Sequence, residues 1–181
     1  MRNIMLDIET LGSVITQIGA LYFNENGEIG DKFLVNVNID SCLKKGLEIQ
    51  YRNLKFWLEK ANLITWTKNT IPISTALARL TEFCNKNKKA RVWSHYYDVM
   101  ILELASYKVG VRIPFHYKRW RDLRTAVDLA GLKREEKKKE DPKTHNALDD
   151  CIYQVGYLVK VLGILVNKRI EIEKKEPVKK R

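Results

Sequence analysis

Near its N-terminus the chain reads NIMLDIETLG over residues 3–12, an apolar stretch that two acidic residues interrupt. The stretch predicts a buried β-strand, and side chains two residues apart on a strand point to the same face. Asp7 and Glu9 would therefore share one face, while Leu6 and Ile8 take the other. Two neighbouring carboxylates repel each other, and burying them without compensation costs several kcal/mol. Either a bound divalent cation or a face open to water would resolve this conflict.

Further strands are expected after this one. Residues 14–23 are rich in β-forming residues. The sequence Asn-Glu-Asn-Gly at 24–27 predicts a hairpin turn, because Asn-Gly adopts positive φ at little cost. Apolar residues alternate over 32–38. We therefore predict an antiparallel meander of three strands, and a short fourth strand over 90–94.

Helices are predicted where apolar residues recur at helical spacing behind capping residues. A frayed, charged C-terminal tail is expected at 168–181, and a mobile loop at 133–143. With no linker to divide residues 1–167, the order of elements predicts one α/β domain, a mixed sheet flanked by helices. The predicted helices are a short one near Asp40 and Ser41, and the segments 54–60, 75–85, 98–108, 121–130 and 147–166.

The net charge of the chain indicates which kind of partner the protein binds. The 181 residues carry 33 Lys and Arg against 22 Asp and Glu, which gives a net charge of +11. Such a balance favours a partner that carries phosphates, nucleic acid before an anionic membrane surface. Charge that serves solubility alone remains an alternative.

The remaining composition excludes several classes of protein. No apolar run approaches the ~20 residues that span a bilayer, and the acids at 7 and 9 interrupt any signal-like stretch, so we expect no membrane insertion. Cys42, Cys84 and Cys151 are scattered and form no CxxC pair. Neither a zinc site nor a disulfide framework is indicated, and a reducing cytoplasm is the expected location.

Two later segments add titratable side chains. Asp98 follows the predicted strand 90–94, where its charge could complement the dipole of a following helix. If Asn146 caps the last helix, His145 lies just outside that helix and Asp150 lies in its first turn. Both side chains could lean toward one cleft, or the acids could merely decorate the helix N-terminus.

Taken together, these features resemble the DEDDh branch of the DnaQ-like 3′–5′ exonucleases, whose fold is RNase H-like. The likeness covers roughly residues 3–163 and extends to the group that contains a bacteriophage exodeoxyribonuclease and a mycobacterial 3′–5′ exoribonuclease. Its motifs are DIETLG at 7–12, WSHYYD at 93–98 and HNALDD at 145–150, with further landmarks IGA at 18–20, NLKFWL at 53–58 and RDLRT at 121–125.

The resemblance implies a metal-dependent exonuclease. Four acids, Asp7, Glu9, Asp98 and Asp150, would hold two divalent cations, and His145 would act as general base. Oxygen ligands without a cysteine cluster favour Mg²⁺ or Mn²⁺ over Zn²⁺, and an imidazole titrates near neutral pH. The substrate-binding candidates are Thr10, Leu11, Gly12, Tyr97 and Arg124.

The predicted activity is therefore release of nucleoside 5′-monophosphates from the 3′ end of single-stranded or frayed DNA or RNA by two-metal-ion hydrolysis. The alternative is a nuclease-like module that binds nucleic acid without cleaving it. Homodimers occur among the relatives that the chain resembles, so a homodimer is possible. The cytoplasmic location would be that of the host if the chain is phage-encoded.

Overall fold

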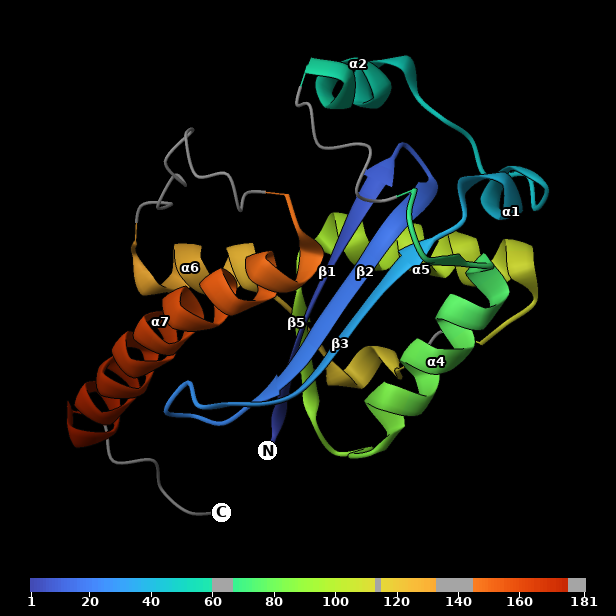
Figure 1. Cartoon of the computed structure of the whole chain (residues 1–181). Helices are drawn as coiled ribbons and strands as arrows, with labels where there is room; N and C mark the ends of the chain where they lie inside the picture. The colour runs from blue at the N-terminus through green and yellow to red at the C-terminus, as the bar shows by residue number, and fades with distance from the viewer. Residues whose placement is uncertain (60–66, 113–114, 133–144, 176–181) are drawn as a thin grey trace.

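The strand β1 lies in the middle of a mixed sheet whose order is β4-β3-β2-β1-β5-β6 (Figure 1). The computed structural model describes residues 1–59, 67–112, 115–132 and 145–175. β2 pairs antiparallel with both β1 and β3, whereas the β1–β5, β5–β6 and β3–β4 pairs are parallel. The strands are β1 Asn3–Leu11, β2 Val14–Phe23, β3 Ile29–Val37, β4 Thr70–Ile71, β5 Arg91–Ser94 and β6 Trp120–Asp122.

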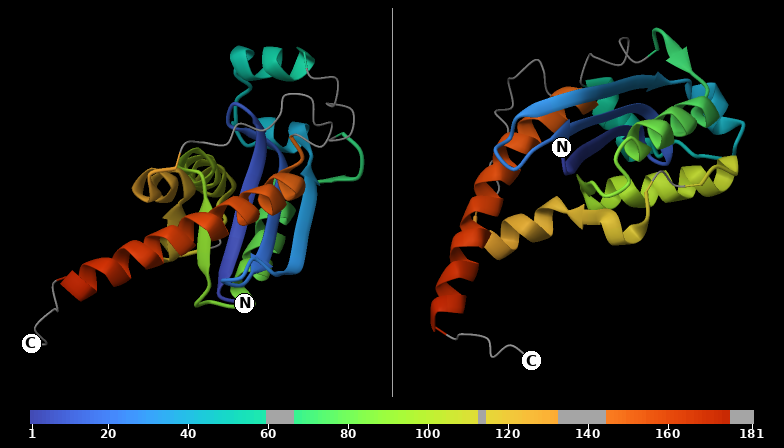
Figure 2. Two further views of the ribbon diagram at one scale, coloured as in Figure 1. Left: turned by 90° about the vertical axis from the view of Figure 1, so that its left-hand side faces the viewer. Right: turned by 90° about the horizontal axis from the view of Figure 1, so that it is seen from below.

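Helices cover both faces of this sheet, with α7 on one side and α4 on the other (Figure 2). The predicted α/β class and the antiparallel meander of three strands are confirmed. The helices are α1 Ile39–Leu43, α2 Tyr51–Glu59, α4 Ile73–Asn85, α5 Tyr96–Val109, α6 Leu123–Ala130 and α7 Ala147–Lys175, with one 3₁₀ turn at Tyr117–Arg119.

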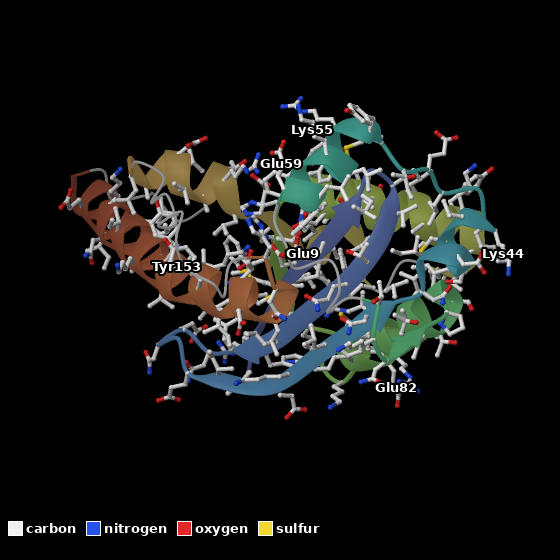
Figure 3. All side chains as sticks on the ribbon, turned by 45° about the horizontal axis from the view of Figure 1, so that its top comes forward. Glu9, Lys44, Lys55, Glu59, Glu82 and Tyr153 are labelled. Carbon is white, nitrogen blue, oxygen red and sulfur yellow. The ribbon has the colours of Figure 1, made fainter. Side chains whose placement is uncertain are left out.

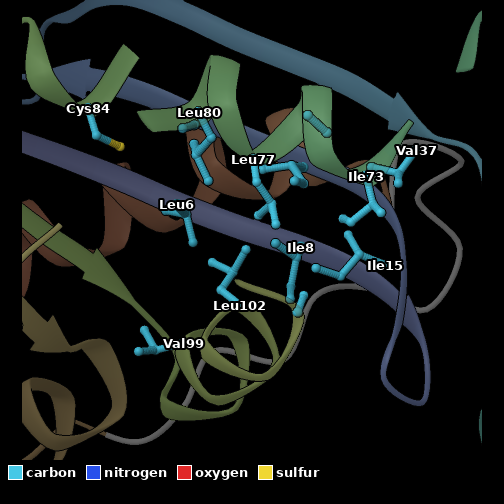
Figure 4. Close-up of a cluster of buried hydrophobic side chains, with 14 of the residues drawn as sticks. Leu6, Ile8, Ile15, Val37, Ile73, Leu77, Leu80, Cys84, Val99 and Leu102 are labelled. Carbon is cyan, nitrogen blue, oxygen red and sulfur yellow. The ribbon is translucent and has the colours of Figure 1, made fainter. Parts of the chain in front are cut away.

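Alternation along β1 divides the core into two clusters. Leu6 and Ile8 point between α4 and α5, where Leu77 and Leu102 meet them (Figure 4). Met5 belongs to the second cluster, which α6 and α7 cover. Every residue of β1 is buried, so the acids on this strand lie inside the protein rather than on an open face.

Several predicted boundaries were wrong. The segment predicted as a helix over 121–130 begins with β6, and β4 was not predicted. Strands of two or three residues are too short for alternation to show in the sequence. α2, α4 and α5 begin two or three residues earlier than predicted, and Asp122 Oδ1 caps α6 by accepting from Thr125 N at 2.7 Å.

The last helix also runs further than predicted. α7 ends at Lys175, not near 166, and so includes most of the predicted tail. The side chain of Lys168 explains part of this extension: Nζ donates to the carbonyls of Leu129 at 3.3 Å and Ala130 at 3.0 Å, at the end of α6. The domain boundary after 167 remains a prediction, and the loop 133–143 and residues 176–181 lie outside the described residues.

Two other predictions concern membrane insertion and the thiols. Among the helices that the structure describes, none is long and apolar enough to cross a membrane. Cys42, Cys84 and Cys151 are free and buried. Burial raises the pKa of Cys42 to about 11 and that of Cys84 to about 12, so both thiols remain protonated at neutral pH.

The first turn of α7 lies directly on β2. A Cβ built on Gly19 would fall 2.4 Å from the carbonyl carbon of Ala147, closer than real side chains approach. Gln17 Oε1 accepts from Ala147 N at 2.7 Å, which satisfies one of the unpaired N–H groups at the helix start. Gly19 and Gln17 thus fix where α7 begins.

Because of this close contact, adding one methyl group at Gly19 should destabilise the fold. Gly19→Ala should lower the free energy of unfolding by about 1–3 kcal/mol, the usual cost of overpacking a well-filled core. Gly156→Ala is the matched control: Gly156 lies exposed within α7 with nothing within 4 Å of a built Cβ, so it should stabilise by about 0.5–1 kcal/mol. Urea unfolding of both variants measures the difference. Equal stability of the two variants would contradict the close contact.

Candidate active site

Three carboxylates meet where β1 passes beneath α7. Asp7 and Glu9 lie two residues apart on β1, and each is only 7% exposed. Asp150 comes from the first turn of α7. One carboxylate oxygen of each residue lies within 4.8 Å of the others. In Figure 3 Glu9 lies between α2 and the beginning of α7, and the predicted shared face of the two β1 acids is confirmed.

A β-bulge shapes the end of β1 next to these acids. Glu9 pairs with Gln17 and Thr10 pairs with Ile15, so Thr16 is an extra residue on β2. Its hydroxyl Oγ1 donates to the carbonyl of Glu9 at 3.0 Å. Bulges re-aim side chains and are frequent beside active sites; here the bulge follows directly after Glu9.

The start of α7 follows the predicted capping pattern. Asn146 Oδ1 accepts from the backbone N–H groups of Leu148 at 3.1 Å and Asp149 at 3.2 Å. Asn146 is therefore the N-cap, and Asp150 lies in the first turn of the helix, as predicted. Because α7 begins on β2, which pairs with β1, this turn brings Asp150 to Asp7.

A glutamine that the sequence analysis missed completes the contact. Gln154 lies one turn after Asp150, and its Nε2 donates to Asp7 Oδ1 at 2.7 Å. The other amide atom, Oε1, is buried without a hydrogen-bond partner among the described residues. The spacing of four residues from Asp150 on the same helix face was the available signal.

Asp98 lies near the same centre but has a second role. It is in the first turn of α5, where Oδ2 accepts from His95 N at 3.3 Å. Burial raises the pKa of the Asp98 carboxyl well above its usual range, and the charge of Asp7 raises it further. The positive charge of Arg124 acts in the opposite direction, which places Arg124 on the Asp98 side of the site.

His145 lies against α2. Its φ is +71°, a left-handed conformation, and its ring meets Phe56 at 5.3 Å and Trp57 at 5.0 Å edge-on. Trp57 Nε1 in turn donates to the carbonyl of Thr10 at 3.0 Å. α2 therefore connects the residue before the α7 cap to the end of β1.

The predicted substrate contacts gather around the β1–β2 turn. Tyr97 OH donates to the carbonyl of Gly12 at 3.3 Å, and the carbonyl of Leu11 accepts from Gln50 N at 3.2 Å. The Leu11 side chain is 3% exposed and belongs to the core, whereas Tyr97 is 45% exposed. The structure thus brings Tyr97 to the turn but buries Leu11.

Three tryptophans, Trp57, Trp66 and Trp93, carry rings of the kind that can stack on bases, but two of them are core residues. Trp57 is 4% exposed and Trp93 is 6% exposed. Trp93 Nε1 donates to Asn3 Oδ1 at 3.2 Å. Trp66, the third candidate, lies outside the described residues.

This sheet order fits an RNase H-like fold, and its central strand carries two of the three clustered carboxylates. Over residues 2–162 the chain matches the family described as the 3′–5′ exoribonuclease Rv2179c-like domain, and it belongs to that family. No match was found among curated proteins. Membership identifies the chain as a 3′–5′ exonuclease, an enzyme whose substrate is nucleic acid.

The buried carboxylates predict a pH-dependent stability. Folding disfavours the ionised form of Asp98, so ionisation of this residue lowers the free energy of unfolding. The loss is complete above the raised pKa. The lost free energy of unfolding is regained as the pH falls from that pKa toward about 4, the pKa of an Asp in the unfolded chain. In EDTA, Asp98→Asn should therefore be more stable than the parent at neutral pH.

Asparagine keeps an acceptor for the His95 N–H group, so the α5 cap survives this change. The advantage of Asp98→Asn should shrink as the pH falls, and thermal unfolding over a pH series measures it. Asp149→Asn, in the first turn of α7, controls for loss of a charge. If the gain in stability of Asp98→Asn over the parent did not change with pH, ionisation of Asp98 would not be the source of the lost stability.

Proposed function

We propose that this chain is a DEDDh-type exonuclease that needs divalent cations and removes nucleoside 5′-monophosphates from the 3′ end of single-stranded or frayed DNA or RNA. The observation that carries the proposal is the cluster of Asp7, Glu9 and Asp150 oxygens within 4.8 Å of one another. Three buried or half-buried carboxylates repel one another strongly unless cations neutralise them.

The donor set fits hard divalent cations. Oxygen ligands of such an ion lie at about 2.0–2.6 Å from it, so two ligands of one ion can be up to about 5 Å apart. Asp7, Glu9 and Asp150 would hold the ions, with Asp98 beside them. A bound pair of Mg²⁺ or Mn²⁺ supplies an activated water and stabilises charge on the leaving 3′ oxygen.

The residues of the chain itself orient these ligands. Gln154 donates a hydrogen bond to one carboxylate oxygen of Asp7 and so fixes the orientation of that carboxylate. The bulge at Thr16 fixes the backbone of Glu9. Because these ligand groups are already held in place, they need not reorient during the reaction.

His145 takes the proton of the attacking water in this proposal. Histidine is the side chain whose unperturbed pKa lies nearest neutral pH, and this residue type therefore suits a general base. Its left-handed backbone and the edge-on contacts with Phe56 and Trp57 restrict where the ring can lie. A general base acts only within hydrogen-bond reach of its proton, so such restriction favours the role.

The terminal nucleotide is proposed to lie over the β1–β2 turn. Tyr97, half-exposed and bonded to Gly12, offers a ring face for a base. Arg124 is exposed near Asp98 and offers a cation for a phosphate. Thr10, Leu11 and Gly12 would contribute through the backbone.

Polarity and metal dependence are tested together with end-labelled DNA and RNA strands of equal sequence. Strands with a free 3′-hydroxyl should shorten to mononucleotides in Mg²⁺, and strands blocked by a 3′-phosphate or incubated in EDTA should persist. Binding in Mg²⁺ without shortening of any strand would favour the non-catalytic module. Equal rates on free and blocked 3′ ends would exclude attack from the 3′ end.

The ligand assignment predicts a contrast between neighbouring acids. Asp150→Asn and Asp7→Asn should each lower the cleavage rate by at least 10²-fold while the metal-free protein stays as stable as the parent or gains stability. Asp149→Asn, which lies outside the three-carboxylate cluster, should cleave at nearly the parent rate. Parent-like cleavage by either cluster variant would overturn the assignment.

The general-base role predicts a change in the pH profile. His145→Ala should lower turnover by roughly 10²–10⁴-fold and leave Mn²⁺ affinity near that of the parent. The parent rate should rise as His145 loses its proton, and this rise should disappear in the variant. Added imidazole should restore part of the rate. Identical log-rate profiles for parent and variant would exclude His145 as the base.

A further inference from the structure

We propose that a second site, the aromatic groove, binds the part of the single strand that precedes the 3′ end. The aromatic groove is a cavity of about 900 Å³ between α4, α5 and residues 115–120. This inference rests on the proposed function, because it assigns the groove to the same substrate. The terminal nucleotide would lie over the β1–β2 turn beside the acidic cluster, and the groove would hold bases further along the strand.

Aromatic rings line this groove in two pairs, and three of the four side chains are exposed. Tyr96 and Trp120 lie with ring centroids 5.7 Å apart, and His116 and Tyr117 lie 4.3 Å apart. Tyr96 is 59% exposed and Tyr117 is 71% exposed, although large apolar surfaces usually avoid water. Ring faces that remain open can stack bases of any sequence.

The charges of the groove suit a polyanion. Lys88 and Arg112 contribute cationic side chains to its wall, against a single carboxylate, Glu103, among the lining residues that the structure describes. A second arginine makes the wall rigid: Arg119 donates to the carbonyls of Ala90 at 2.8 Å and of Asn87 at 3.0 Å. Aromatic rings interleaved with cations are the combination that binds single strands without sequence preference.

The groove begins close to the proposed active site. Tyr96 lies two residues before Asp98, at the start of α5. Trp120 Nε1 donates to Ser94 Oγ at 3.0 Å, and Ser94 is the last residue of β5. One end of the groove therefore lies at the strand end from which α5 carries Asp98.

The size of the cavity leaves room for more than one base. A volume of about 900 Å³ lies near the upper end of the roughly 300–1,000 Å³ typical of small-ligand pockets. A few stacked bases fill such a space, and the net charge of +11 favours a nucleic acid over a basic peptide or a second copy of this chain.

Binding in EDTA tests the proposal, because the parent then cannot cleave the strand. The probes are a fluorescent single strand of roughly 12 nucleotides, within the range of single-strand site sizes, and a dinucleotide. Tyr117→Ala should weaken binding of the longer strand by about 5- to 150-fold, the value of one stacked base. Arg112→Ala should lower the slope of log affinity against log salt by about 0.7, one lost phosphate contact.

Matched controls lie outside the groove. Tyr107→Ala removes a tyrosine of α5 that is 83% exposed, and Arg79→Ala removes an exposed arginine of α4; neither residue lines the groove. Both controls should bind the longer strand like the parent. All four variants should hydrolyse the dinucleotide in Mg²⁺ at the parent rate, because that substrate is too short to reach the groove.

The outcomes separate this inference from the proposed function. A parent that hydrolyses neither probe in Mg²⁺ refutes the proposed function. Dinucleotide hydrolysis with parent-like affinity of Tyr117→Ala and Arg112→Ala for the longer strand refutes the groove alone. An equal loss in Tyr107→Ala also refutes it, because any exposed ring would then suffice.

Discussion

The contact between the start of α7 and β2 brings Asp150 to the two acids of β1, and the proposed active site depends on it. Gly19 lets the backbone of Ala147 approach the strand, and Gln17 Oε1 accepts the Ala147 N–H at 2.7 Å. Asp7 pairs with Gly19 in the sheet. The same two β2 residues therefore lie beside the acids of β1 and beneath the helix that carries Asp150.

This arrangement concentrates negative charge in a basic protein. The chain carries a net charge of +11, yet Asp7, Glu9 and Asp150 cluster together, and the charge of Asp7 acts on Asp98. Burial and the neighbouring charge of Asp7 both disfavour the ionised form of Asp98, a cost that the apolar clusters on the two faces of the sheet must offset. Functional sites often lower the stability of a fold in this way, because they hold charged groups in places where those groups are unfavourable.

The sequence allowed the geometry of the acids to be predicted because it depends on local periodicity. The alternation of β1 places Asp7 and Glu9 on one face, and Asn146 caps α7 as its side-chain chemistry requires. Features that depend on tertiary contacts were missed: the short strands β4 and β6, the hydrogen bonds of Gln17 and Gln154, and the extension of α7 that Lys168 accompanies. Local periodicity carries no information on which distant carbonyl or carboxylate a polar side chain will meet.

The most direct measurement is a titration of the metal-free protein with Mn²⁺, followed by electron paramagnetic resonance of the free ion. We expect saturable binding of two ions per chain, as two-metal hydrolysis requires, with displacement by Mg²⁺. The double variant Asp7→Asn, Asp150→Asn should lose this binding while remaining folded. Absence of saturable binding in the parent, or unchanged binding in the double variant, would contradict the assignment of the acidic cluster as a metal site.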